Sequence, residues 1–258
     1  MGMKKGQVSI FIIVAIAILA AIVIFFFLKG EMGDVQSTEW ETVESIILDC
    51  ADDVTQDSLE LIGVQGGFYN EPPYYYFDME WAYIPYYYYE GELLMPENSV
   101  IEGELSDYVD DNLVGCLESF EIEGYEITHS EPSTKVSIEE EQVGFDIDMI
   151  VNIKKGEMTS QLNLAEFPAN KPSALGKILD VAEYITDSHL EPEICLTCLY
   201  EMLEDRELYL DFVDFGNSST LVVFSENKTS ENPYAFEFLN KYTAEESGLE
   251  LQEVANGN

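Results

Sequence analysis

The sequence predicts an α+β protein in which an N-terminal transmembrane helix precedes an ectodomain of amphipathic helices and antiparallel sheets. Three observations lead to this expectation. Residues Val8–Leu28 form an apolar run in which Ser9 is the only polar side chain. Beyond it, two long segments repeat apolar residues every three or four positions, which is typical of helices buried on one face. Several shorter segments alternate apolar and polar residues, as the strands of a half-exposed sheet do.

The apolar run is long enough to cross a membrane. As a helix, Val8–Leu28 would span roughly 31 Å, against a hydrocarbon core about 30 Å thick. Lys4 and Lys5 precede the run, whereas the chain beyond it is strongly acidic. Because positive charge is retained on the cytoplasmic side, we expect a cytoplasmic N-terminus. The C-terminal domain would then lie outside the cell membrane, at the cell surface.

The charge of the chain is unevenly divided. The sequence has 51 Asp and Glu residues against 11 Lys and Arg residues, a net charge of −40. Three lysines lie in the first thirty residues, so the remaining 228 residues carry a balance of −43. A body this negative repels phosphate, which excludes general nucleic-acid binding and docking on anionic lipid through the ectodomain. The hydrophobic content of 47% is normal for a folded protein and argues against a disordered chain.

The residues directly before the apolar run form a distinctive pattern. Lys4-Lys5-Gly6-Gln7 places two lysines and a glycine ahead of the helix. Over about the first thirty residues, the chain resembles the class III signal peptide of archaeal type IV pilins and archaellins. The resemblance implies that a prepilin peptidase cuts between Gly6 and Gln7 and leaves the apolar helix at the mature N-terminus. The fifth mature residue would be Phe11, where many pilins have glutamate. The alternative is an uncleaved signal anchor with lysines in its flank.

The expected domain organisation follows the chain in six parts. They are a leader (1–6), the membrane helix (7–29), a hinge (30–38), a helical, tyrosine-rich and β-meander part (39–166), a C-terminal part of two helices and three strands (167–242), and a flexible tail (243–258).

Two amphipathic helices open the ectodomain. The first is expected from about Glu39 to Ile62, with acidic residues opposite its apolar stripe, and Gln65-Gly66-Gly67 should end it. The second is expected from a cap at Ser99 through Phe120. Its apolar stripe is the strongest helical pattern of the ectodomain and consists of Ile101, Leu105, Tyr108, Val109, Leu113, Cys116 and Leu117.

The segments after the second helix predict strands and two more helices. An antiparallel meander is expected over Phe120–Thr128, Lys135–Glu139, Val143–Ile153 and Met158–Leu164. Pro172 suits the first turn of a third helix, and a shorter fourth helix is expected over Pro192–Leu203. Three last strands are expected over Leu208–Phe215, Thr220–Ser225 and Tyr234–Leu239.

Three short segments beyond the signal region carry a second resemblance. Gln65-Gly66-Gly67, Ile84-Pro85-Tyr86-Tyr87 and Cys195-Leu196-Thr197-Cys198, together with the layout, resemble uncharacterised membrane-anchored surface proteins of small-genome archaea. This resemblance implies no activity.

All four cysteines lie in the expected ectodomain. Outside the cytoplasmic membrane, an even number of cysteines favours disulfides. Cys50 and Cys116 each lie on the apolar stripe of a different long helix, so facing helices would bring them together in a bridge. The alternative is a pair of buried free thiols that pack as small apolar side chains.

Cys195-Leu196-Thr197-Cys198 is a CxxC motif, which suits a structural disulfide, a redox pair or part of a zinc site. A structural disulfide is the expectation. No second CxxC completes a zinc site, although His189 is a potential third ligand. The redox alternative needs an activated thiolate at a helix N-terminus, and the neighbouring Glu191 and Glu193 disfavour a thiolate. We therefore expect neither a metal nor a cofactor.

Residues 72–89 are unusually aromatic and hold eight of the sixteen tyrosines. Strand-forming aromatic residues beside prolines predict a stiff loop or a hairpin. Alternate side chains of a strand face opposite sides, so some rings should stay accessible as a platform for a polysaccharide or a surface protein. The alternative is that the rings cover the domain and pack on neighbouring strands. The candidate platform residues are Tyr74, Tyr75, Tyr76, Trp81, Tyr83, Tyr86, Tyr87, Tyr88 and Tyr89.

Catalytic patterns are sparse, and we do not expect an enzyme. His129 and His189 are the only histidines, and neither has a nucleophile in a recognisable motif. Acidic pairs such as Asp110-Asp111 are abundant at this composition and indicate a solvated face, with calcium binding as the alternative. Asn217 and Asn227 begin glycosylation triplets near expected turns, which fits an exterior location.

These observations favour a single-pass surface protein with a pilin-like N-terminus and a structural, adhesive or filament-subunit role. In the filament version, the apolar helices of many copies pack together. An alternative is an anchored extracytoplasmic binding module that uses the tyrosine-rich segment. The third alternative is a thiol–disulfide oxidoreductase that uses Cys195 and Cys198. The membrane and further copies of the chain are the expected partners, besides the ligand of the platform.

Overall fold

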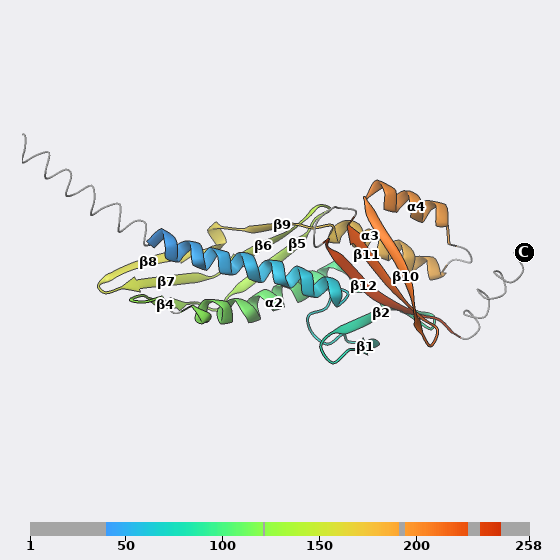
Figure 1. The fold of residues 1–258 in the computed structure, drawn as a ribbon, viewed down its shortest axis with the longest axis horizontal. Helices are drawn as coiled ribbons and strands as arrows, with labels where there is room; N and C mark the ends of the chain where they lie inside the picture. Colours follow the sequence, from blue (N-terminus) through green and yellow to red (C-terminus); the bar gives the residue numbers. More distant parts are fainter. Residues whose placement is uncertain (1–39, 121, 191–193, 227–232, 244–258) are drawn as a thin grey trace, which may run out of the picture. The chain divides into compact units, whose positions relative to one another are not determined.

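The structure is a computed structural model that describes residues 40–120, 122–190, 194–226 and 233–243 (Figure 1). The expected leader, membrane helix and hinge lie outside these residues, as does the expected tail after residue 243. Within the described ranges, no helix is both long enough and apolar enough to cross a membrane. The chain divides into two packing units, Met1–Ile47 and Leu48–Asn258, and the second unit contains all the sheets. Its mixture of helices and sheets confirms an α+β fold.

Two long helices hold the apolar stripes that the sequence predicts. Residues 40–64 are helical, and of these residues 48–64 belong to the second unit. Helix α2 covers Asn98–Ser119 and buries five members of the predicted stripe: Ile101, Leu105, Val109, Leu113 and Leu117. The expected cap at Ser99 is wrong, because α2 begins one residue earlier and Glu97 occupies the N-cap position without a side-chain cap bond. Ser99 instead lies in the first turn.

A six-stranded sheet combines the tyrosine-rich segment with the C-terminal strands. Its order is β1 (Tyr76–Asp78), β2 (Tyr83–Tyr89), β12 (Ala235–Lys241), β11 (Ser219–Glu226) and β10 (Leu208–Gly216), with β3 (Glu92–Leu93) also paired to β2. Strands β2 and β12 run parallel, whereas the other neighbours are antiparallel. The three C-terminal strands lie where the sequence predicts them, within one or two residues at each end.

The expected four-strand meander is instead divided between two three-stranded sheets. One sheet has the order β4 (Glu126–His129), β7 (Ile150–Lys155) and β8 (Met158–Asn163); the other has the order β5 (Ser133–Ile138), β6 (Gln142–Asp148) and β9 (Ala169–Pro172). The single strand expected over Val143–Ile153 is wrong, because β6 and β7 are separated at the buried Met149 and enter different sheets. The first expected strand is shortened, since its pairing begins only at Glu126.

The last helices begin later than the sequence predicts. Pro172 is the final residue of β9, which pairs with β6, so it is not in the first turn of α3 (Leu175–Asp187). A 3-10 turn, η2 (Ser188–Leu190), follows α3, and α4 covers Leu196–Asp205, although the sequence favours a start at Pro192. Another 3-10 turn, η1 (Leu164–Glu166), precedes β9.

Strands from both sides of the expected division at residue 166 share sheets. Strand β9 lies beside β6, and the buried Lys171 of β9 forms a 2.6 Å ion pair with Asp52 of the first helix. Strand β2 likewise lies beside β12. The parts 39–166 and 167–242 are therefore joined through shared sheets from residue 48 onward.

Candidate functional site

The tyrosine-rich segment forms a hairpin at one edge of the six-stranded sheet. Strands β1 and β2 pair antiparallel, with Phe77 opposite Ile84 and Asp78 opposite Tyr83. The connecting turn is closed by the Met79 N–H, which donates to the Ala82 carbonyl oxygen at 2.9 Å. Since β1 has no neighbour on its outer side among the described strands, the hairpin presents side chains at the edge of the domain.

Two of the candidate platform residues belong to the core. Tyr87 is 0% exposed and Tyr88 is 3% exposed. The Tyr87 ring stacks on Phe238 with 4.1 Å between centroids, and the Tyr88 ring stacks on His189, also at 4.1 Å. Neighbouring residues of a strand point to opposite faces, and both faces of β2 are covered here. The expectation that these two rings are accessible is therefore wrong.

Four other rings are open to solvent. Tyr74 is 65% exposed, Tyr75 48%, Phe77 41% and Trp81 68%. We call these four residues the aromatic platform. Phe77 is absent from the set that the sequence favours, although it lies on β1 only two residues after Tyr75. Tyr76, Tyr83, Tyr86 and Tyr89 are half-buried.

The platform rests on other aromatic rings. Tyr75 stacks on Tyr89 with 3.8 Å between ring centroids, and Tyr89 in turn meets the Tyr86 ring edge-on at 5.2 Å. Phe77 packs edge-on against Phe215 of β10 at 4.9 Å. Such contacts stabilise ring orientation beyond the effect of buried area. Tyr75 and Phe77 are thus each held by a ring contact on one side, and the rest of each ring remains exposed to solvent.

The hairpin is fastened to the end of the first helix by residues that the sequence marks only as a helix stop. The buried Gln65 accepts the Tyr83 N–H through its side-chain oxygen at 2.9 Å, and the Tyr87 hydroxyl donates to the Gly66 carbonyl oxygen at 3.0 Å. Gly66 has φ +53°, and a Cβ there would lie 2.6 Å from the Glu237 carbonyl oxygen. This close approach requires glycine. In the sequence, Gln65 and the two glycines after it indicate the end of the helix, but nothing there identifies Tyr83 or Tyr87 as their partners.

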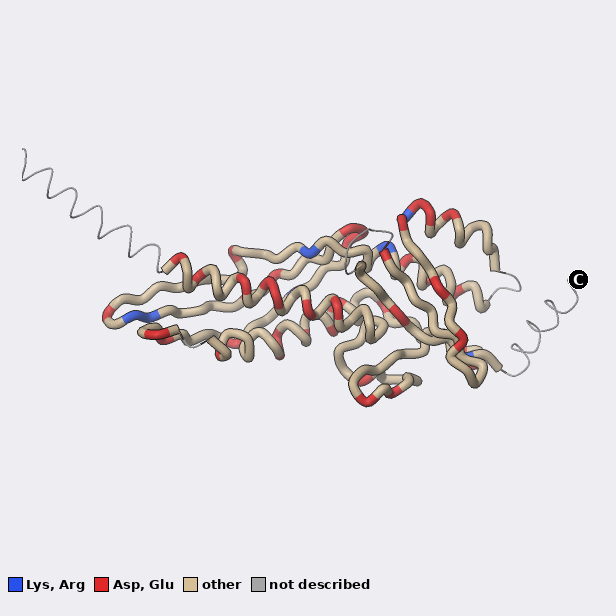
Figure 2. Tube along the Cα trace, in the orientation of Figure 1, with Lys and Arg blue, Asp and Glu red and all other residues tan. Residues whose placement is uncertain are grey.

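The surroundings of the platform are acidic. Residues 71–93 contain five acids and no Lys, Arg or His. All five are exposed: Glu71, Asp78, Glu80, Glu90 and Glu92. Figure 2 shows the same imbalance along the chain, with Asp and Glu on most elements and Lys and Arg at a few places. Exposed rings beside carboxylates attract cations, because the faces of the rings and the acids are both negative.

One carboxylate of this region accepts a hydrogen bond from a tyrosine hydroxyl. The Tyr76 hydroxyl donates a hydrogen bond to the Glu71 carboxylate, which raises the pKa of Tyr76 to about 12. The bond needs the neutral phenol, so it persists at neutral pH. Because the pKa is higher in the folded chain than the 10.0 of an unperturbed tyrosine, any stabilisation is present below pH 10 and is lost as the pH rises through about 12.

We predict that Glu71→Gln lowers the pKa of Tyr76 toward the ordinary tyrosine value, because the charged acceptor is removed. Carbon-13 NMR of labelled tyrosine rings during a pH titration measures this change, and Tyr76→Phe assigns the resonance. Glu90→Gln is the matched control, since it removes another exposed carboxylate of the same hairpin and should leave the resonance unchanged. An unaltered Tyr76 titration in Glu71→Gln would contradict the bond.

The cysteines form two disulfides of different character. Cys50 and Cys116 are joined at an S–S distance of 2.01 Å across 66 residues, which is the pairing that the two apolar stripes predict. Cys195 and Cys198 are joined at 2.05 Å. Both cysteines of the CxxC motif are exposed, and Cys195 is the N-cap residue of α4.

The described residues around His189 and the CxxC motif do not form a zinc site. His189 contacts the carbonyl oxygens of Ile185 and Thr186 through Nδ1, at 3.0 and 3.1 Å. Its Nε2 lies 3.4 Å from the Tyr242 hydroxyl. Over the part of the chain that the structure describes, no three His, Cys, Asp or Glu side chains are grouped so as to hold a metal ion.

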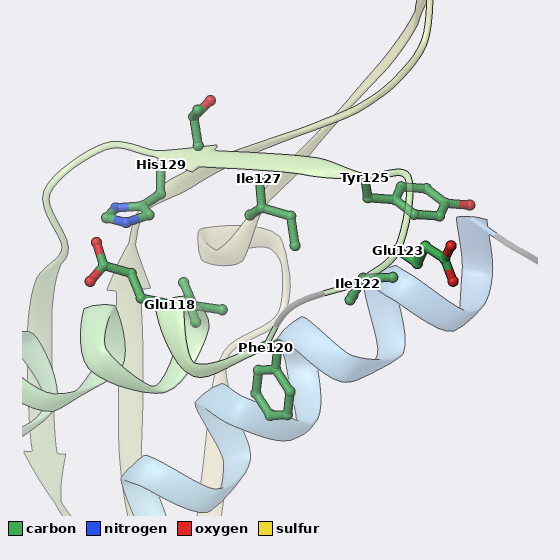
Figure 3. A pocket seen from close by; sticks show the side chains of 9 residues that line it. Glu118, Phe120, Ile122, Glu123, Tyr125, Ile127 and His129 are labelled. Carbon is green, nitrogen blue, oxygen red and sulfur yellow. The ribbon is translucent and has the colours of Figure 1, made fainter.

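A separate hollow of about 780 Å³ lies after the C-terminal end of α2 (Figure 3). Its lining combines Phe120, Ile122, Tyr125 and Ile127 with Glu118, Glu123 and His129. Figure 3 shows His129 and Glu118 on the same side of the hollow. His129 Nδ1 lies 3.1 Å from the Ser130 carbonyl oxygen. Among the lining residues that the structure describes there is no cysteine or serine, and the aliphatic hydroxyl beside this histidine is that of Thr128.

One expected glycosylation residue lies in a suitable place. Asn217 is exposed in the tight turn between β10 and β11, with φ +52°. A side chain in such a turn is accessible for modification. Asn227 lies outside the described residues.

Comparison with known proteins adds no assignment: no family model matches the chain, and no curated protein or solved structure shows a significant similarity to it.

Proposed function

We propose that the chain is a membrane-anchored cell-surface protein with an adhesive role, in which the aromatic platform binds a partner that carries basic side chains. The observation that carries the binding role is the exposure of Tyr74, Tyr75, Phe77 and Trp81 on a hairpin whose remaining rings are packed. The anchor is supported by the apolar run Val8–Leu28, and the extracytoplasmic orientation by the lysines before it.

The four exposed rings of the platform lie within eight residues of the chain, a concentration that favours a binding surface. Large apolar side chains gain free energy when they leave water, and clustered exposed rings are typical of interaction sites. Aromatic residues also dominate the binding energy of interfaces. Here Tyr75 and Phe77 are already held by Tyr89 and Phe215, so little conformational entropy remains to be lost on binding.

The charge around the platform selects the class of partner. Residues 71–93 contribute five carboxylates and no basic residue. The paired strand β12 brings Lys241 opposite Tyr89, and its Nζ donates to the Asn217 carbonyl oxygen at 2.7 Å. An arginine or lysine side chain would gain from both the ring faces and the carboxylates, which also steer the encounter. A neutral polysaccharide could stack on the rings but would gain nothing from the charge. A filament role depends instead on residues 7–29, which lie outside the described residues.

Binding of an arginine-rich peptide to the full chain in detergent micelles tests the proposal. We expect wild-type affinity to fall as salt is raised from low to physiological concentration, because exposed charges are screened. Replacing Tyr74, Tyr75 and Trp81 together by serine should weaken binding at least about 30-fold, as the loss of a binding hot spot does. Tyr209→Ser is the matched control, because it removes an exposed ring on β10, outside the hairpin.

Two outcomes would overturn the proposal. Equal affinity of the triple variant and the wild type would show that the rings are not the binding surface. Tight binding of a neutral glucan with no response to salt would replace the basic partner by a polysaccharide. Serine replacement of Tyr86–Tyr89 is a poor test, since it also removes the buried Tyr87 and Tyr88.

A further inference from the structure

The CxxC disulfide occupies a more reactive position than the sequence indicates. Cys195 is the N-cap residue of α4, and the Cys198 N–H donates to Cys195 Sγ at 3.2 Å. The first turn of α4 contains no acidic residue. Partial positive charge at a helix N-terminus and a backbone N–H donor both favour a thiolate at this position.

The two disulfides differ in access. Cys195 and Cys198 are both exposed, whereas Cys50 is buried. Exchange requires a thiolate to reach a sulfur atom directly. The CxxC bridge is therefore open to a partner thiol, and the bridge between the two long helices is shielded on its Cys50 side.

Helix α4, which carries the CxxC bridge, contacts α3 at both of its ends. The Tyr184 hydroxyl of α3 donates to the Cys195 carbonyl oxygen at 3.2 Å. Leu199 is buried, and Arg206 at the end of α4 pairs with Asp180 of α3 at 3.4 Å. These contacts fix both ends of α4 and orient the bridge toward solvent.

Exposed apolar side chains flank the bridge along the sequence. Leu196 and Tyr200 on α4 are largely exposed, and Leu190 and Ile194 before the motif are exposed as well. An exposed disulfide within such a surface suits a polypeptide whose cysteines are flanked by apolar residues. A small hydrophilic thiol would not use these side chains.

We propose that the Cys195–Cys198 bridge is a thiol–disulfide exchange site that oxidises the dithiol of an apolar extracytoplasmic polypeptide. This activity is independent of binding at the aromatic platform. A substrate thiolate attacks Cys195 Sγ, the Cys195–Cys198 bond breaks, and its electron pair leaves on Cys198 Sγ, which takes a proton from water.

The second step releases the product. The other substrate thiolate attacks the substrate sulfur of the mixed disulfide. Cys195 leaves as a thiolate that accepts the Cys198 N–H and then takes a proton from water. The substrate dithiol thereby becomes a disulfide, and the protein disulfide becomes two thiols. Two electrons pass from substrate to protein, and the protons lost by the substrate thiols balance those that the protein thiols gain.

The test uses the full chain in micelles and a synthetic peptide with two cysteines flanked by leucines. The wild-type protein should oxidise one molecule of reduced peptide per chain. Alkylation followed by mass spectrometry should show that the Cys50–Cys116 bridge remains intact. With the oxidised peptide, Cys198→Ser should trap a mixed disulfide through Cys195 at least tenfold faster than Cys195→Ser traps one through Cys198. Leu196→Ser combined with Tyr200→Ser should slow exchange with the peptide but not with dithiothreitol.

Three results would overturn the proposal. The first is that the two single cysteine variants trap the peptide at equal rates. The second is that the protein exchanges with the peptide no faster than a free cysteine peptide does. The third is that the apolar substitutions leave the rate of exchange with the peptide unchanged. The wild-type reaction requires no substitution, so it tests the exchange even where a variant folds poorly.

Discussion

Replacing both Cys50 and Cys116 by alanine should lower the free energy of unfolding by about 4 kcal/mol. The bridge joins residues 66 positions apart, so its loss frees a long loop in the unfolded chain. It also connects the first helix to α2, both of which bury an apolar stripe. Alanine is the suitable replacement because Cys50 is buried and a polar hydroxyl there would lack a partner.

Urea unfolding of the full chain in mild detergent measures this loss. Replacing Cys195 and Cys198 by alanine is the matched control, because that bridge spans only three positions and the same relation assigns it about 2 kcal/mol or less. Equal losses for the two pairs would contradict the account of the long loop. Two alkylatable thiols at Cys50 and Cys116, in denaturant without reductant, would contradict the bridge itself.

Tyr87→Ala should cost about 4 kcal/mol of folding free energy, since it removes a fully buried ring from between the hairpin and the sheet core. Tyr87→Phe keeps the ring but leaves the Gly66 carbonyl oxygen without its 3.0 Å donor, which should cost about 1–2 kcal/mol. Burial also raises the pKa of Tyr87 well above the ordinary tyrosine value, so this hydroxyl stays a donor at neutral pH.

The control for this prediction is Tyr74→Ala, which removes a largely exposed ring from the same segment. Its effect should lie within about 0.5 kcal/mol, as for most surface substitutions. Urea unfolding of the three variants under one set of conditions gives the comparison. Similar losses for Tyr87→Ala and Tyr74→Ala would contradict the division of the hairpin into packed and open rings.

Local sequence patterns predict the helices and strands of this fold better than they predict which of these elements pack or pair with one another. The stripe from Ile101 to Leu117 identifies α2 because the helical period depends only on local sequence. Alternation shows which side chains of a strand share a face, but it does not show which strand lies alongside. The split between β6 and β7 at Met149 and the parallel pairing of β2 with β12 both depend on contacts distant in sequence.

The candidate site shows the same limit. Composition identifies residues 72–89, and alternation indicates that not all the rings share one core. It cannot show that both faces of β2 are covered, because Phe238 and His189 come from elements far along the chain. The anchor at Gln65 was likewise hidden, since its partner Tyr83 is eighteen residues away. The position of Cys195 at the start of α4 depends on a helix that begins later than the sequence indicates.

The fluorescence of Trp81 tests most directly whether the aromatic platform is a binding surface. The chain has two tryptophans, so Trp40→Phe leaves Trp81 as the only tryptophan. Titration of this full-length variant with the arginine-rich peptide should protect Trp81 from acrylamide quenching, and added salt should reverse the protection. Peptide binding that leaves the quenching of Trp81 unchanged would place the binding surface elsewhere and contradict the account.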